Sequence, residues 1–279
     1  LEGLGVDALG INCGLGPKQM KEIVKELLKY ASIPVIVNPN AGLPRSENGK
    51  TVFDVGAEEF AQDMEEIVTM GAWFAGGCCG TTPAHIQAMV EKCKEITPVP
   101  ITPKNYTFVT SYSTAVELGG RPVIIGERIN PTGKSKFKQA LRDHNIDYIL
   151  EEGVKQEDSG AHILDVNVGV PEIDEAAMME TIVYELQSIM PIPLQIDTTN
   201  MEAMERALRI YNGKPMINSV NGKAEIMEQV FPLVKKYGGV VVGLALDEDG
   251  IPDTTEGRLA IAEKIYQTGE KYGISRKDI

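Results

Sequence analysis

Residues 162–200 read HILDVNVGVPEIDEAAMMETIVYELQSIMPIPLQIDTTN and decide the fold, because they contain a strand, a helix and a second strand. The apolar runs HILDVNVGV (162–170) and PLQIDTTN (193–200) predict strands. Between them, apolar residues recur at helical spacing through DEAAMMETIVYELQSIM (174–190). Strands that alternate with helices in this way are typical of parallel βαβ construction. The stretch therefore predicts an α/β fold.

The same alternation continues on both sides of this stretch. Three more strands are predicted in the same series, at RPVIIGERIN (121–130), PMINSVNG (215–222) and GVVVGLALDEDG (239–250). An earlier series has three strand–helix units, with strands at DALGIN (7–12), PVIVNPN (34–40) and AWFAGGCC (72–79). Neither series has enough strands to close a barrel. We therefore expect two (β/α)8 TIM-type barrels in tandem, each only partly present.

The two series are separated by a segment of different composition. TPVPITPKNYTFVTSYS (97–113) contains three prolines, several hydroxyl residues and no helical periodicity. Such composition is typical of an inter-domain linker. We therefore expect a first domain over residues 1–96, a linker over 97–120 and a second domain over 121–279.

Three of the four cysteines lie in glycine-flanked turns, namely Cys13 in GINCGLGP and the adjacent Cys78 and Cys79 in GGCCGTTPAHI. Adjacent cysteines rarely close a disulfide on each other, because the geometry is too tight. Three thiolates that leave one position open are a catalytic arrangement for zinc. Small buried core cysteines are the alternative. Each turn follows a predicted strand, and α/β barrels gather their active sites there. Cys93, in a helical stretch, reads as a spectator.

Polar residues follow every predicted strand of the second series. They are Glu127 and Asn130, Asp165 and Asn167, Asp197 and Asn200, Asn218 and Asn221, and Asp247 and Asp249. Any one of them is explained as a turn residue or a helix cap, but in a barrel all five pairs converge on one mouth. Carboxylates and amides, with little basic charge beyond Arg128, suit a neutral heterocycle with N–H and C=O edges. His144 and His162 are not placed for catalysis.

Composition excludes several classes of function. The chain has 279 residues and a net charge of -13, so it lacks the basic surface that non-specific nucleic-acid binding needs. It has no apolar run long enough to cross a membrane and no signal peptide. Four unevenly placed cysteines favour the reducing cytoplasm. The absence of an initiator Met and the abrupt end in ISRKDI indicate a fragment of a longer protein.

These motifs carry a family resemblance. GINCGLGP followed by GGCCGTTPAHI resembles the end of the homocysteine S-methyltransferase domain. GERINPTG, LDVNVGVP, QIDTTN, NSVNG and LDEDGIPDT resemble the start of the pterin-binding domain of methyltetrahydrofolate methyltransferases. The two in this order resemble the cobalamin-dependent methionine synthases. The loop NPTGKSKF differs from that of dihydropteroate synthase, a relative in fold.

The resemblance implies roles by position. Cys13, Cys78 and Cys79 match zinc ligands that activate homocysteine, and Asn12 would lie near that amino acid. Six residues of the second domain match or neighbour positions that line the pterin pocket: Asp165, Asn167, Asp197, Asn218, Glu127 and Asn130. The implied reaction transfers a methyl group from 5-methyltetrahydrofolate through cobalamin to homocysteine, giving methionine and tetrahydrofolate. The cobalamin-binding domain would lie elsewhere in the same full-length protein, so we expect little turnover from the fragment alone.

Alternatives stay open at this point. The zinc domain of a corrinoid-protein methyltransferase could serve a different thiol, because the strands that select the substrate are missing. A non-catalytic pterin-binding module could carry a structural zinc, which would need a fourth protein ligand such as His85. His85 is otherwise expected to be a residue of the helix that follows Pro83. Dihydropteroate synthesis is disfavoured by the loop sequence and by the fused thiolate domain.

Overall fold

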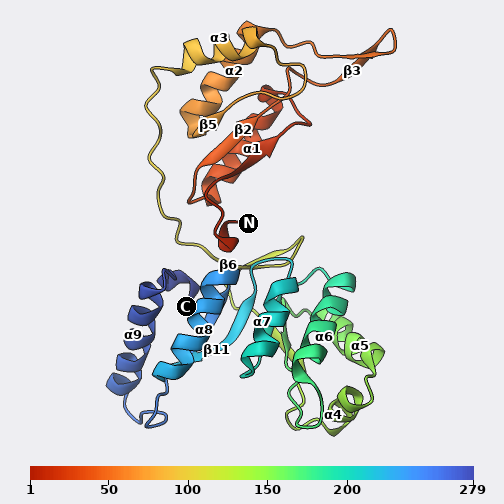
Figure 1. Ribbon diagram of the computed structural model, residues 1–279, viewed down its shortest axis with the longest axis vertical. Coiled ribbons are helices and arrows are strands. Elements are labelled where there is room, and N and C mark those ends of the chain that lie inside the picture. Colours follow the sequence, from red (N-terminus) through yellow and green to blue (C-terminus); the bar gives the residue numbers. More distant parts are fainter. The chain divides into compact units, whose positions relative to one another are not determined.

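The computed structural model describes residues 1–279, which divide into two compact units. The first comprises Val6–Asn105 with Glu2, and the second comprises Tyr106–Ile279 with Leu1 and Gly3–Gly5. Both contain parallel strands that alternate with helices, so the predicted α/β class is confirmed (Figure 1). No helix is long and apolar enough to span a membrane.

The first unit is built on three parallel strands in the order β1-β2-β5. These strands are β1 (Leu9–Asn12), β2 (Val35–Asn38) and β5 (Phe74–Ala75). The helices that follow them are α1 (Pro17–Tyr30), α2 (Ala57–Met70) and α3 (Pro83–Cys93). Met20, Val24, Phe60, Met64 and Ile67 are fully buried in the core between strands and helices. The sheet therefore has three of the strands that a closed barrel would need.

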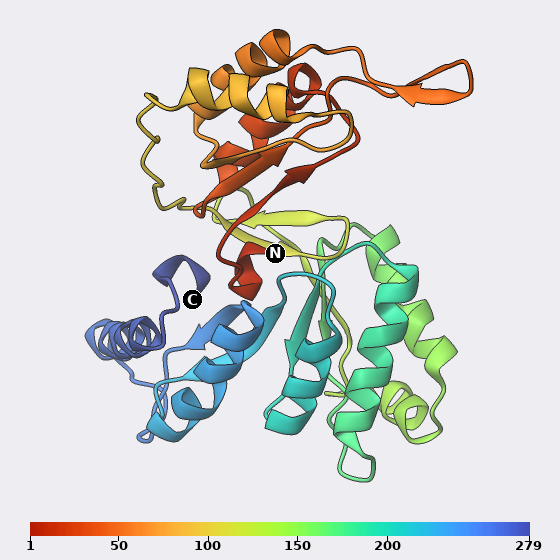
Figure 2. The same cartoon turned by 45° about the horizontal axis from the view of Figure 1, so that its top comes forward.

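A two-stranded hairpin lies between β2 and α2, where the sequence analysis placed no element. Its strands are β3 (Arg45–Glu47) and β4 (Lys50–Val52), and it projects from the rest of the unit (Figures 1 and 2). Asn48 and Gly49 form its turn with φ angles of 51° and 74°. An Asn-Gly pair in this left-handed region is the usual sequence of a two-residue hairpin turn. The signal was therefore present in the sequence.

The second unit is built on five parallel strands in the order β12-β11-β10-β9-β8. The strands are β8 (Ile125–Ile129), β9 (Ile163–Val166), β10 (Leu194–Asp197), β11 (Met216–Asn221) and β12 (Val240–Leu244). The helices are α4 (Ser135–Arg142), α5 (Ile146–Asp158), α6 (Glu175–Ile189), α7 (Met201–Ile210), α8 (Ala224–Tyr237) and α9 (Thr255–Lys271). Each strand pairs with the next in sequence, as in part of a barrel.

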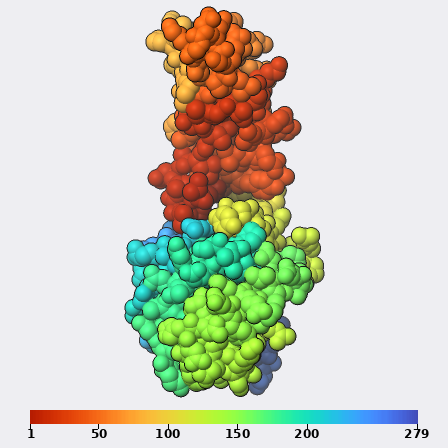
Figure 3. All heavy atoms as spheres, turned by 90° about the vertical axis from the view of Figure 1, so that its right-hand side faces the viewer, coloured from red at the N-terminus to blue at the C-terminus, as the bar shows by residue number.

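Alternate residues of these strands face two different environments. Leu164, Val166, Leu194 and Ile196 are buried against the helices in the main core. The helical segments coloured green and teal form much of the outer surface that Figure 3 presents. Residues on the opposite face of the sheet point toward the interior of the partial barrel. That interior holds the polar residues described below.

A second hairpin covers the amino-terminal end of this sheet. Its strands are β6 (Thr107–Thr110) and β7 (Ala115–Leu118). Val109 packs against Ile163 and Val240, and all three side chains are buried. These residues lie within the segment 97–120 for which the sequence predicts a linker. The segment has the composition of a linker because its strands are only four residues long and lie among Pro, Thr and Ser residues. From Tyr106 onward, however, it packs as part of the second unit.

Polar contacts fix this hairpin to the strand ends. The backbone N–H of Thr110 donates to Lys214 O at 2.9 Å, and the N–H of Lys214 donates to Thr110 Oγ1 at 2.8 Å. Gly213 is required here, because a Cβ atom at this position would lie 2.1 Å from Thr110 O. The approach of hairpin and loop is therefore too close for any other residue.

Tyr211 links the hairpin to the sheet, and its replacement by phenylalanine tests that link. The buried hydroxyl donates to Thr110 O at 2.8 Å and accepts from the N–H of Leu194 at 3.0 Å. Tyr211→Phe leaves both partners unsatisfied, so we expect a loss of about 1–3 kcal/mol in the free energy of unfolding, measured by urea denaturation. Tyr184→Phe is the control, because Tyr184 is 62% exposed. Equal stability of the two variants would contradict the link.

Candidate functional site

Three cysteine thiols of the first unit meet at the carboxyl ends of its strands. Cys13 directly follows β1, and Cys78 and Cys79 lie in the loop that follows β5. The carboxyl end of β2, the strand between them, holds both segments. The N–H of Cys13 donates to Asn38 O at 3.0 Å, and the N–H of Cys78 donates to Pro39 O at 2.8 Å. The parallel sheet thus brings together residues that are 65 or more positions apart in sequence.

The thiol cluster of Cys13, Cys78 and Cys79 has dimensions that fit a zinc ion. The Sγ of Cys79 lies 3.8 Å from that of Cys13 and 3.9 Å from that of Cys78, and all three sulfur atoms lie within 4.8 Å of one another. Zn–S bonds of about 2.3 Å in tetrahedral geometry place two sulfur atoms about 3.8 Å apart. The donor set and its spacing therefore suit a three-thiolate zinc site.

The backbone around the thiol cluster adopts unusual conformations. Cys13 has a φ of 67°, which is uncommon for a residue with a side chain. Gly80, directly after the cysteine pair, has a φ of 79°, and a Cβ atom there would lie 2.4 Å from the Phe53 ring. Strained conformations of this kind cluster at functional sites. The glycine in CCG is thus needed by the turn that presents the two thiols.

Asn40 is a buried residue of this site that the sequence analysis did not select. Its side chain is 3% exposed, and its Oδ1 accepts from the N–H of Cys79 at 3.0 Å. The N–H of Ala41 donates in turn to Cys79 O at 2.9 Å. Asn40 lies in PVIVNPN, where an asparagine after a strand also reads as a turn residue. Its position after the middle strand was the available signal.

The other predicted residues of the first unit have clear positions. Asn12 ends β1 beside Cys13, and its side chain is exposed at the same end of the sheet. His85 lies in the first turn of α3, where Nδ1 contacts Thr82 Oγ1 at 2.8 Å and Nε2 contacts Val55 O at 2.9 Å. Both ring nitrogens have protein partners, so His85 is a helix residue as expected. Cys93 is at the end of α3, outside the thiol cluster.

Hydrogen bonding shifts the pKa values of two thiols of the cluster, Cys13 and Cys79, in opposite directions. A hydrogen bond from the backbone N–H of Gly14, and then hydrogen bonds with Cys79 and Cys78, lower the pKa of Cys13. Hydrogen bonds with Cys13 and Cys78 raise the pKa of Cys79. Burial raises the pKa of the isolated Cys93. The pKa of Cys13 is thus lower than that of Cys79.

The second unit gathers amides and carboxylates inside its partial barrel. We call Asn130, Asp165, Asn167, Gln195 and Asp197 the polar cluster. Asp165 and Gln195 face each other across the register of β9 and β10. Asp197 is two residues further along β10, at its carboxyl end. Asp165 is also two residues beyond Ile163, so it lies directly above the apolar residues that the β6–β7 hairpin covers.

Hydrogen bonds connect the members of the polar cluster. Asn130 Nδ2 lies 3.4 Å from both Asp165 Oδ2 and Asp197 Oδ2. Asn167 Nδ2 donates to Asp197 Oδ2 at 3.0 Å, and Gln195 Nε2 donates to Asp165 Oδ1. Both oxygens of Asp165 are therefore used within the chain, whereas Asp197 uses only Oδ2. The second oxygen of Asp197 is available to a ligand.

The sequences of both units match known families. Residues 126–279, more than half of the chain, match the family described as "Pterin binding enzyme". The chain belongs to the pterin binding enzymes. Residues 1–93 match the family described as "Homocysteine S-methyltransferase". The two resemblances predicted from the sequence motifs are thus confirmed, in the predicted order.

Two curated relatives align with the whole of this chain. The methionine synthase of Mycobacterium leprae is 33% identical over 294 aligned positions, which include all of this chain and 24% of that protein. The methionine synthase of Mycobacterium tuberculosis is 32% identical over 289 positions, with the same coverage. The chain thus aligns as a fragment of a methionine synthase and spans about a quarter of the length of these curated relatives. The structure of a 7,8-dihydropteroate synthase from Vibrio fischeri can be superposed on part of the chain. The superposition covers 61% of this chain and 64% of that one, with 16% identity and a TM-score of 0.46.

The remaining predicted residues of the pterin-binding unit lie around the polar cluster. Asn218 in β11 pairs with Asp197 in the strand register and is half-buried. Glu127 in β8 is exposed and lies 3.8 Å from Lys134 Nζ. Asn200 caps α7, accepting from the N–H groups of Glu202 and Ala203. Asn221 and Asp247 accept from backbone N–H groups two residues ahead. These last three thus have the local roles of caps and turns.

Burial controls the acidity of the two aspartates. Burial raises the pKa of Asp165 to about 6, aided by the charges of Asp197 and Glu127 and opposed by the amides of Gln195 and Asn130. Burial also raises the pKa of Asp197, with Glu127 and Glu175 adding to the effect and Asn167 opposing it. The polar cluster is therefore an acidic site whose charge changes near neutral pH.

The raised pKa of Asp165 predicts a pH-dependent effect on stability. Between pH 4 and pH 6 the folded carboxyl holds a proton that the unfolded one has lost, so stability falls as the pH rises. Asp165→Asn removes this dependence. We expect the free energy of unfolding of the variant to rise by about 2 kcal/mol relative to that of wild type on going from pH 4 to pH 7, measured by urea unfolding at both pH values. The same difference between the two proteins at both pH values would contradict the assignment.

Two cavities lie near the pterin-binding strands. One of about 520 Å³ is lined by the loops after β9 and β10, including Pro171, Glu175 and Asn200. Thr198, directly after β10, donates to Glu175. The N–H of Gly169, another lining residue, donates to Asn167 Oδ1 at 2.9 Å, so this cavity adjoins the polar cluster. Thr198 and Glu175 were not predicted, because a polar pair at a loop and helix start has no distinctive pattern.

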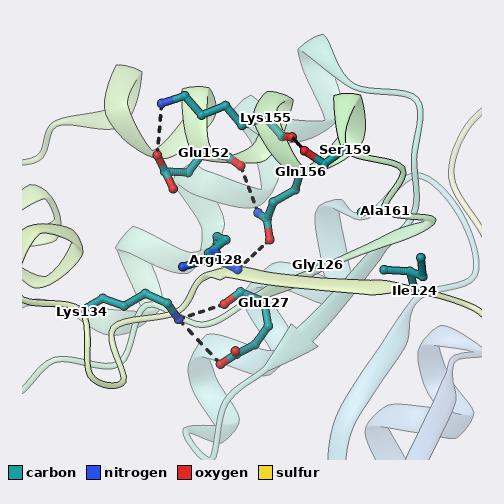
Figure 4. A pocket seen from close by; sticks show the side chains of 10 residues that line it. All are labelled: Ile124, Gly126, Glu127, Arg128, Lys134, Glu152, Lys155, Gln156, Ser159 and Ala161. Carbon is teal, nitrogen blue, oxygen red and sulfur yellow. Dashed lines mark hydrogen bonds and ion pairs between the residues drawn. The ribbon is translucent and has the colours of Figure 1, made fainter.

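The other cavity, of about 700 Å³, lies where β8 meets α5 (Figure 4). Its lining includes Glu127, Arg128 and Gln156, but neither aspartate of the polar cluster. Gln156 reaches from α5 and accepts from the backbone N–H of Arg128 at 2.7 Å (Figure 4). Lys134 pairs with Glu127, and Lys155 pairs with Glu152 of the same helix (Figure 4).

Proposed function

We propose that the protein containing this chain transfers a methyl group from 5-methyltetrahydrofolate, by way of cobalamin, to zinc-activated homocysteine, giving methionine and tetrahydrofolate. The observation that carries the proposal is the thiol cluster at the strand ends of a homocysteine S-methyltransferase unit, joined to a pterin-binding unit in one chain. Methionine synthases are the whole-chain relatives that combine the two. Cobalamin would bind outside this chain.

In this proposal Cys13, Cys78 and Cys79 hold zinc, and Asn40 orients Cys79 through its backbone N–H. Zinc bound there supplies Lewis acidity that lowers the pKa of a substrate thiol. Asn12, exposed beside Cys13, would contact the amino acid part of homocysteine. The exposed position of Cys79 leaves the cluster open on one side for the substrate sulfur. The four unpaired cysteines support a reducing compartment, the cytoplasm.

Six residues of the second unit would hold the pterin ring, directly or through one another: Asp165, Asn167, Asp197, Asn218, Glu127 and Asn130. Asp197 offers a carboxylate oxygen without a protein partner, which suits the N–H groups of an amino-pyrimidine edge. Asn167 and Asn218 can both donate and accept at its two sides. Residues 1–96 are thus proposed as the C-terminal part of the zinc barrel and 121–279 as the N-terminal part of the pterin barrel.

The contacts of His85 bear on the alternative of a structural zinc. A structural site is closed by four protein ligands, and both nitrogens of His85 already have partners in the helix cap and at Val55. These contacts argue against His85 as a fourth ligand and support a zinc site with one open position. The identity of the thiol acceptor rests on the family of the first unit.

X-ray absorption at the zinc edge of the whole protein tests this function. We expect three sulfur ligands without substrate and a fourth sulfur ligand after homocysteine is added. Other thiols serve as controls for the acceptor. A zinc site already closed by four protein ligands, or the absence of bound zinc, would contradict the proposed thiol activation by the first unit. Neither result would affect the proposed pterin binding by the second unit.

A further inference from the structure

Gln195 has a position that neither the motifs nor the family assignment explains. It lies in the middle of β10, between Leu194 and Ile196, and is 6% exposed. A buried amide in a strand interior is costly unless its hydrogen bonds are made. Its Nε2 donates to Asp165 Oδ1, and the strand register places the two residues opposite each other. Gln195 is thus tied to one carboxylate.

The surroundings of Asp165 show why such a partner is needed. Asp165 is 2% exposed and lies just above the apolar residues Ile163 and Val240. The charged groups that reach it are Asp197 on β10 and Glu127 on β8, and both are acidic. No cation compensates the carboxylate. Only two amides, those of Gln195 and Asn130, donate to it.

We infer that Gln195 is a positioning residue that holds the Asp165 carboxylate in its ionised form and in a fixed orientation for pterin binding. This inference rests on the proposed pterin-binding function. Asn130, which donates to Asp165, also lies 3.4 Å from Asp197 Oδ2. Gln195 therefore acts indirectly, through Asp165. Asp165 accepts a hydrogen bond from the Asn130 amide. Asn130 in turn positions the Asp197 carboxylate, which would contact the pterin.

The order of residues along the barrel interior supports this role. From the amino-terminal end, the apolar residues come first, the Asp165–Gln195 pair second and Asp197 third. Gln195 is the only amide in the second layer opposite Asp165 in the register. Because the pair lies below the layer that faces a ligand, Gln195 influences binding without touching the pterin.

NMR of the chain labelled with carbon-13 at the aspartate carboxyl group tests the inference without any ligand. The Asp165 signal is assigned by its loss in Asp165→Asn. In Gln195→Leu we expect the titration midpoint of Asp165 to rise by about 1 pH unit, the size expected from losing one hydrogen bond to a charged group. Gln187→Leu is the control, since Gln187 donates only to the backbone oxygens of Val183 and Ile210. An unchanged midpoint in Gln195→Leu overturns the inference.

Binding of 5-methyltetrahydrofolate to the whole protein, measured by calorimetry at pH 6 and pH 8, provides the second readout. The affinity lost in Gln195→Leu should be about fivefold larger at pH 6 than at pH 8, and Gln187→Leu should show no such difference. An equal loss at both pH values overturns the inference. If wild type binds no 5-methyltetrahydrofolate, the proposed function fails, and the NMR titration still decides the role of Gln195. Should Gln195→Leu not fold, Gln195→Glu adds a second carboxyl at nearly the same volume and should raise the midpoint further.

Discussion

Cys79→Ser should remove zinc from the protein. The Cys79 sulfur is the central one of the thiol cluster, because it lies within 3.9 Å of both other sulfurs. Loss of a residue that only supports a metal ligand costs about 10–100-fold in affinity, so loss of the central ligand should cost more than about 100-fold. Metal content after dialysis against a chelator measures the effect.

Cys93→Ser is the matched control for this experiment. Cys93 is a partly buried cysteine of the same unit, at the end of α3 and outside the thiol cluster. The Cys93→Ser variant should retain one zinc per chain. Circular dichroism should show that both variants are folded. Wild-type zinc content in Cys79→Ser would contradict the proposed ligand set.

Asp197→Asn should weaken binding of 5-methyltetrahydrofolate by about 10- to 100-fold, as expected when a hydrogen bond to a charged group is lost. Asp197 has one carboxylate oxygen that no group of the chain uses, whereas both oxygens of Asp165 are taken. Replacing the carboxylate by an amide would place the N–H donor of asparagine opposite an N–H donor of the pterin, so no hydrogen bond could form there. Calorimetry with the whole protein measures the change.

Asp174→Asn provides the comparison for Asp197→Asn. Asp174 caps α6 by accepting from the N–H of Ala177, and asparagine is an equally good cap. It lines the cavity of about 520 Å³ that adjoins the polar cluster, but it is outside the cluster itself. The affinity of Asp174→Asn for 5-methyltetrahydrofolate should stay within a factor of about two of the wild-type affinity. Equal weakening in both variants would show that Asp197 has no special role.

The sequence was sufficient for the features that follow from periodicity. The strand predicted at 193–200 is observed at Leu194–Asp197, and the helix predicted at 174–190 is observed at Glu175–Ile189. Polar residues directly after apolar runs identified Asp165 and Asp197, because parallel strands end at a common edge. Glycine-flanked cysteines identified the thiol cluster in the same way.

Other features depend on contacts between distant residues and could not be predicted from local patterns. Gln195 interrupts an apolar strand, and only the register with β9 shows that it faces Asp165. Asn40 looks like a turn residue until its contact with Cys79 is seen. The strands of the β6–β7 hairpin have four residues each, too few for an alternating pattern to stand out from a linker.

The β6–β7 hairpin also bears on how this unit can be exchanged between genes. The hairpin precedes the first strand of the five-stranded sheet in sequence, yet it covers Ile163 and Val240. A crossover at residue 120 would deliver the sheet without this cover and expose its apolar end to water. A crossover in residues 94–105, after α3 and before β6, would keep the hairpin together with the sheet that it covers. Viable chimeras between related genes should therefore have their junctions within those twelve codons.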